Sequence, residues 1–167
     1  LQHLPKELRP YLRKLGVVFG ALDIFAHALL KPAPRQLLHA LGIDQRPLQE
    51  AMLPVIAEQK RLLAGYRPAG SQAIRVDLAE KILRAAFEAR AKKQGPDKKP
   101  PQRFQLDIAL PISIGLEEAN IARLLGAAGF RQFKAKPLAE GAFGPEAPDS
   151  WGWRPRQAGE RRDGRKG

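Results

Sequence analysis

Arginines interleaved with aromatic side chains are the residues of this chain best suited to binding a ligand. They form a candidate nucleic-acid-binding set, which comprises Tyr66, Arg67, Arg75, Arg131, Trp153 and Arg154. Guanidinium groups attract phosphates, and aromatic rings or guanidinium planes stack on unpaired bases. The pattern therefore favours contact with single-stranded RNA over any reaction at a catalytic centre.

Most of these residues also have a purely structural interpretation. Tyr66 can close a helix end, Arg75 can pair with a carboxylate, and Trp151 and Trp153 can pack inside a small module. The chain has only two tyrosines and two tryptophans, so we do not expect an extended stacking platform. The sequence leaves both interpretations open.

The sequence gives little support to catalysis or metal binding. Gly159 and Gly164 have the spacing of a phosphate-binding loop, but Arg165 and Lys166 follow them in place of Lys and Ser/Thr. The three histidines have no partner at helical spacing, and the chain has no cysteine. No serine lies in a nucleophile-elbow pattern. We therefore predict a non-enzymatic chain without a cofactor or metal.

The net charge of +12 is concentrated in two segments, 92–103 and 151–167, each of which carries +4. Such segments are either solvated linkers and tails or arms that strengthen RNA binding by releasing counterions. The absence of cysteine fits a reducing compartment. The chain has no run of about 18 apolar residues, so we predict no membrane-spanning helix. We expect a cytoplasmic protein without a membrane partner. The start at Leu1 suggests the end of a longer polypeptide.

Helical spacing dominates the first half of the chain. We predict a short β-type run over 17–19 and helices over 4–15, 21–30, 35–41 and 47–64, the last with a kink or a break at Pro54. A turn over 65–70 follows, and then a short β-branched run over 74–76. Asp77 and Glu80 have the spacing of a capping box, which predicts a helix that begins there and ends near Lys92.

The second half begins after a segment rich in proline and lysine, 93–103. Alternating apolar residues predict a short strand or an extended entry over 104–108, and an amphipathic helix over 117–128 ends at Gly129. A strand through the two tryptophans that returns onto residues 130–133 would explain their alternation.

Together these elements predict a mainly α-helical protein. Its expected parts are a helical accessory domain over 1–92, a basic linker over 93–103, a small helix-turn-helix or winged-helix-like module with short strands over 104–156, and a disordered basic tail over 157–167.

Several stretches, taken in their order, resemble a known family. They are Leu15-Gly16-Val17 with Gly20, Ala28 to Pro32, Gly65-Tyr66-Arg67 with Gly70, Ile74 to Asp77, Phe104 to Leu110, Gly115-Leu116, Gly129 to Arg131, and Trp151 to Arg154. Over most of residues 4–156 the chain resembles the C-terminal region of bacterial relatives of the mitochondrial-degradosome DExH-box ATP-dependent RNA helicase. It departs from that pattern at Val18 and Ala21, where a basic residue is more usual.

The resemblance implies a non-catalytic C-terminal accessory region that supports the motor domains of the same polypeptide and contacts RNA nonspecifically. One alternative is a protein-interaction module that recruits a nuclease or another partner, which a large exposed apolar patch would favour. A third possibility is a winged-helix DNA-binding domain. The helix over 117–128 disfavours it, because two acids begin this helix and Arg123 is its only basic residue.

Overall fold

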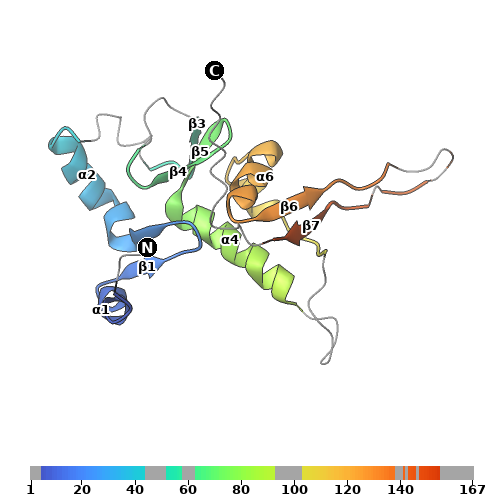
Figure 1. Cartoon of the computed structure of the whole chain (residues 1–167). Coiled ribbons are helices and arrows are strands. Elements are labelled where there is room, and N and C mark those ends of the chain that lie inside the picture. Colours follow the sequence, from blue (N-terminus) through green and yellow to red (C-terminus); the bar gives the residue numbers. More distant parts are fainter. Residues whose placement is uncertain are drawn as a thin grey trace, which may run out of the picture.

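Small antiparallel sheets alternate with helices along the chain (Figure 1). The computed structural model describes residues 5–43, 52–57, 63–92, 103–137, 141, 143–145 and 147–154. Within these residues there are five α-helices and three two- or three-stranded sheets, with 42% of the residues helical and 21% in strands. The fold is mixed α/β, so the prediction of a mainly α protein is wrong. The predicted linker residues 93–102 and the tail 157–167 lie outside the described residues.

Residues 5–43 form two short helices around a hairpin. Their elements are α1 (Leu8–Lys14), β1 (Val17–Phe19), β2 (Ile24–Ala26), a 3-10 helix η1 (His27–Leu30) and α2 (Pro32–Ala40). The strands pair antiparallel, with Val17 opposite Ala26 and Phe19 opposite Ile24. The run predicted over 17–19 is confirmed, and the helix predicted over 21–30 is wrong, because pairing with β1 draws its middle into a strand.

A three-stranded sheet follows, in the order β3-β5-β4. Its strands are β3 (Val55–Ala57), β4 (Tyr66–Ala69) and β5 (Gln72–Arg75), and both pairings are antiparallel. β3 occupies part of the helix predicted over 47–64, most of whose other residues lie outside the described ranges. Pro54 disfavours a helix here, and Val55 and Ile56 are β-branched. β4 is an edge strand, which accommodates Pro68 without loss of a ladder hydrogen bond.

Helix α4 (Val76–Ala91) begins directly after β5 and crosses the centre of the molecule (Figure 1). Its buried apolar residues recur at spacings of three and four, as in an amphipathic helix. The N-cap is Arg75 in an extended conformation, and no side chain caps the helix. The predicted capping box is therefore wrong, since Asp77 lies inside the first turn and Glu80 points to a distant part of the chain.

The last elements are α5 (Ala109–Ser113), α6 (Glu118–Ala127), β6 (Phe130–Phe133) and β7 (Ser150–Trp153). The helix predicted over 117–128 is confirmed to within one residue at each end. The predicted return of the tryptophan strand is also confirmed, with Phe130 opposite Trp153 and Phe133 opposite Ser150. The strand expected over 104–108 reduces to a single bridge between Phe104 and Trp151.

One hydrophobic core joins the sheets and helices that follow residue 63. It consists of Ala69, Ile74, Ala79, Ile82, Leu83, Ala86, Phe104, Leu116, Ile121, Leu124, Leu125, Phe130 and Trp151. These residues come from both sides of the predicted linker, and the domain boundaries at 92 and 104 stay predictions. By contrast, Arg35 is the only buried residue within 5–43. No helix in the described ranges has the length and apolarity needed to cross a membrane.

Candidate nucleic-acid interface

Tyr66 is placed inside the protein, with 3% of its surface exposed. Its hydroxyl donates a hydrogen bond to the carbonyl of Leu53 at 2.5 Å, and the guanidinium carbon of Arg35 lies 5.3 Å from its ring centroid. A ring held this way fastens β4 to the segment before β3. It presents no open face on which a base could stack.

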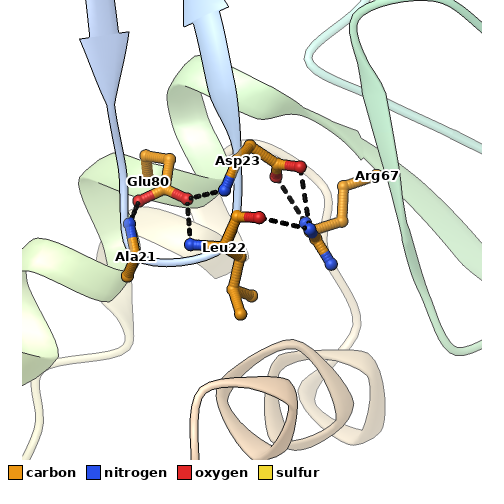
Figure 2. A network of polar contacts seen from close by, with 5 residues as sticks. All are labelled: Ala21, Leu22, Asp23, Arg67 and Glu80. Atoms are coloured by element: carbon orange, nitrogen blue, oxygen red, sulfur yellow. Dashed lines mark hydrogen bonds and ion pairs between the residues drawn. The ribbon is translucent and has the colours of Figure 1, made fainter. Parts of the chain in front are cut away.

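Arg67 holds the turn of the β1–β2 hairpin (Figure 2). Its Nε donates to Asp23 Oδ2, and its Nη2 donates to Asp23 Oδ1 at 2.7 Å. The same Nη2 also donates to the carbonyl of Leu22 at 3.0 Å. The hydrogen bond to Asp23 raises the pKa of Arg67 above its usual value. This guanidinium therefore joins β4 to the hairpin.

Glu80 binds the same turn from the side of α4 (Figure 2). Its carboxylate accepts hydrogen bonds from the backbone N–H groups of Ala21, Leu22 and Asp23, at 2.6, 2.7 and 2.8 Å. A Cβ atom on Gly20 would lie 2.1 Å from the carboxyl carbon of Glu80, so any larger residue there would push the carboxylate out of its three hydrogen bonds. The turn and the carboxylate therefore form one interlocked unit, which sequence inspection missed because they lie 57 to 59 residues apart.

A second hairpin turn is held in a similar way. The side-chain oxygen of Asn120, a buried residue of α6, accepts a hydrogen bond from the backbone N–H of Ser71 at 3.2 Å. Its amide nitrogen donates to Gln72 Oε1 at 2.9 Å. Gly70, with φ of +64°, leaves the space that this amide fills, because a Cβ there would lie 2.1 Å from the oxygen of Asn120.

Arg75 pairs with a carboxylate, which is one of the two roles that the sequence left open for it. Its Nε and Nη2 donate to the two oxygens of Asp77 at 2.7 and 2.9 Å. Burial by itself would raise the pKa of Asp77, but the hydrogen bond from Arg75 and its positive charge outweigh burial and leave that pKa lowered. Contact of Tyr66, Arg67 or Arg75 with RNA stays a prediction, and each has an intramolecular partner.

The other predicted residues come together on the β6–β7 sheet. A groove of about 430 Å³ is lined there by Arg103, Arg131, Phe133, Gly152, Trp153 and Arg154. We call it the β6–β7 groove. Arg131 lies opposite Gly152 in the strand pairing, so the partner strand has no side chain beside it. The three lining arginines are exposed, form no ion pair with any described residue, and share the groove with no acidic residue.

Two guanidinium groups stack on aromatic rings at this surface. The guanidinium carbon of Arg103 lies 4.1 Å from the ring centroid of Phe133, and that of Arg90 lies 4.0 Å from the ring centroid of Trp153. The indole N–H of Trp153 donates to the carbonyl of Ala128 at 3.0 Å, which fixes the ring. Stacking orients each guanidinium plane and keeps its N–H donors at the edge.

Sequence inspection identified part of this surface and missed the rest. Trp151 is 3% exposed and belongs to the core, whereas Trp153 is half-buried and lines the groove. The missed residues are Arg90, Arg103 and Phe133. The spacing of two between Arg131 and Phe133 on a strand could have revealed Phe133. Nothing local marks Arg90, because its place depends on how α4 packs against β7.

No group of three or more His, Asp or Glu side chains in the described part of the chain is arranged to hold a metal ion. Comparisons of the chain with protein-family models, curated proteins and solved structures found no match.

Proposed function

We propose that the chain is a non-catalytic accessory region of an ATP-dependent RNA helicase, and that its β6–β7 groove contacts single-stranded RNA without reading its sequence. The helicase parent follows from the family resemblance. The RNA contact is carried by one observation: three exposed arginines without carboxylate partners share one groove with two arginine-stacked rings.

The chemistry of the groove suits an unpaired strand. Guanidinium N–H donors match phosphate oxygens, and a guanidinium plane that already lies on a ring offers its outer face to a base. Contacts of this kind tolerate any base, because phosphates are identical and every base has a π-face. Duplex DNA fits less well, since α6 follows Glu117, begins with Glu118 and has Arg123 as its only basic residue, so this helix attracts phosphates poorly.

The test is a fluorescence-anisotropy titration with labelled single-stranded RNA at two salt concentrations. Two phosphate contacts are lost in the double variant Arg131→Gln with Arg154→Gln. We therefore expect roughly tenfold weaker binding and a salt slope smaller by about 1.4. Arg123→Gln is the matched control, because Arg123 is an exposed arginine of α6 outside the groove.

Wild-type affinity in the double variant would exclude the groove as the RNA site. The titration is repeated with a truncated chain that ends at Arg154 and therefore lacks the basic residues of 155–167. If this truncation alone removes all binding, the affinity comes from those charges rather than from the groove.

A second candidate function, docking of a protein partner, is favoured by the exposed apolar side chains of the first 43 residues. Each has between 46% and 63% of its surface exposed, and they are Leu8, Tyr11, Leu15, Ile24, Leu29, Leu37, Leu41 and Ile43. The first three lie on one face of α1 and just after it, at spacings of three and four. Exposed apolar groups at this density are typical of an interaction surface.

In the helicase proposal the partner is the motor of the same polypeptide, and in the alternative it is a separate nuclease. The variant with Leu15→Ser, Leu37→Ser and Leu41→Ser tests the first. We expect it to lower the unfolding temperature of the motor in the full-length helicase and to leave RNA affinity of the isolated chain unchanged. If the unfolding temperature of the motor stays unchanged and the variant loses binding to a purified nuclease, the alternative is favoured.

A further inference from the structure

A second groove lies between the β1–β2 hairpin and α4, with a volume of about 590 Å³. We call it the hairpin groove. The side chains that matter here are Phe19, Phe25 and His27 on the hairpin side and Lys81, Arg84 and Phe87 on α4. Glu80 and Arg67 hold the hairpin turn, so its wall stands fixed against the helix (Figure 2).

The free charges of the hairpin groove are positive. Lys81 and Arg84 are exposed, and neither forms an ion pair with a residue in the described ranges. The acidic lining residues, Asp77 and Glu80, are both engaged. Asp77 accepts two hydrogen bonds from Arg75, and Glu80 accepts three from the hairpin turn. An anion that enters the groove therefore meets two exposed cations, whereas the two carboxylates are more buried and turned toward partners within the fold.

Aromatic rings accompany these cations. Phe25 and His27 meet edge to face, with their ring centroids 5.0 Å apart, and His27 is exposed. Phe87 lines the other end and is half-buried. The hairpin groove thus shares unpaired cations and aromatic rings with the β6–β7 groove, and differs from it by the two carboxylates that bind within the fold. The features that the two grooves share suit phosphates and unpaired bases.

The two grooves meet on α4. Phe87 lines the hairpin groove and Trp153 lines the β6–β7 groove, and their ring centroids are 6.1 Å apart. Arg90, one turn after Phe87 on α4, lies over the ring of Trp153. Figure 1 shows α4 running from the hairpin at its first half toward β6 and β7 at its second. The Phe87–Trp153 contact therefore joins the linings of the two grooves.

We propose that one strand of RNA occupies both grooves and crosses α4 at the Phe87–Trp153 contact. Its phosphates face Lys81 and Arg84 at one end and the arginines of the β6–β7 groove at the other. This inference rests on the proposed function, because it extends the path of the same ligand. An acidic peptide could be drawn by the same cations, but it would leave the ring faces of both grooves unused.

The experiment uses the whole chain and labelled oligouridine strands of about 4 and about 12 nucleotides, which span the usual range of single-strand site sizes. For the variant Lys81→Gln with Arg84→Gln, we expect roughly fivefold weaker binding of the long strand and a salt slope smaller by about 1.4. The short strand is expected to bind at the β6–β7 groove alone, so its affinity should change by less than about twofold. Arg123→Gln is the control for a lost surface charge. We also expect a stoichiometry of one long strand per chain.

The outcomes separate this inference from the function on which it rests. Wild-type affinity of the Lys81/Arg84 variant for the long strand overturns the extended path and leaves the β6–β7 groove in place. Binding of two long strands per chain would contradict a single continuous strand through both grooves. If the Lys81/Arg84 variant loses affinity only for an acidic peptide, the hairpin groove is a protein-binding site instead. No RNA binding by the unaltered chain overturns both proposals. His27→Ala, an exposed ring, repeats the test if the double variant is unstable and should weaken only the long strand.

Discussion

The residues up to 43 and those after 63 are held in place by different forces. After residue 63, apolar side chains from two sheets and two long helices close around a shared core. In residues 5–43 many large apolar side chains are exposed, the one buried residue is an arginine, and Leu22 packs against the edge of that core. Polar contacts supply most of the attachment of this earlier part, because Glu80 and Arg67 bind the hairpin turn and Arg35 lies over Tyr66. Core stability and hairpin position are therefore separable properties.

The largest effect that distinguishes the two parts comes from shortening a leucine in each. Leu83 is completely buried in α4, and Leu83→Ala should lower the free energy of unfolding by about 2–5 kcal/mol, because it leaves a cavity. Leu37 is 60% exposed in α2, and Leu37→Ala should change the same quantity by less than about 0.5 kcal/mol. Urea unfolding followed by circular dichroism measures both. Equal losses would mean that the first 43 residues share the core.

A smaller and more local effect is expected at the contact between the two parts. Glu80→Gln removes the charge from an acceptor of three backbone hydrogen bonds, so the turn amides should open more easily by about 1–3 kcal/mol. Hydrogen exchange of the amides of Ala21, Leu22 and Asp23 reports this opening. Amides in the second half of α4 should keep their protection. If they exchange faster by the same amount, the hairpin and the core open as one unit.

The smallest effect concerns a pair that lies entirely on the core side. The folded-state pKa of Asp77 lies below its ordinary value of 3.8, so the ionised group stabilises the fold above that pH. This contribution fades as the pH falls through 3.8 toward the lower folded-state pKa. Between about pH 5 and pH 3 the wild type should lose about 0.5 kcal/mol more stability than Asp77→Asn. Urea unfolding at both pH values tests this, and parallel losses would show that the pair contributes nothing.

The same contrast explains which elements the sequence could predict. The helix at 117–128 was predictable from its local periodicity and from Gly129 at its end. The strand at the two tryptophans was predictable from their alternation, and the structure contains both elements. The segment 21–30 also has helical spacing, but its strand depends on pairing with β1 and on a turn held by Glu80. Local propensity is overridden where a contact from a distant residue satisfies the backbone.

The candidate site was predictable to a similar degree. Arg131, Trp153 and Arg154 lie near one another in the sequence or on paired strands, and they do line one groove. Tyr66, Arg67 and Arg75 look the same by residue type, yet each has a partner within the fold. The difference depends on Asp23 and Asp77, and nothing in one sequence says which arginine Asp23 will meet.

The close fit of Glu80 against Gly20 has a consequence for the history of this chain. A Cβ at position 20 would come within 2.1 Å of the Glu80 carboxyl carbon, so a side chain there would displace the carboxylate from the hairpin turn. Descendants of a common ancestor that keep glutamate at 80 should keep glycine at 20, whereas those with a shorter residue at 80 can admit alanine or serine. Paired exchange of this kind, 60 residues apart, would be the evolutionary trace of a single contact.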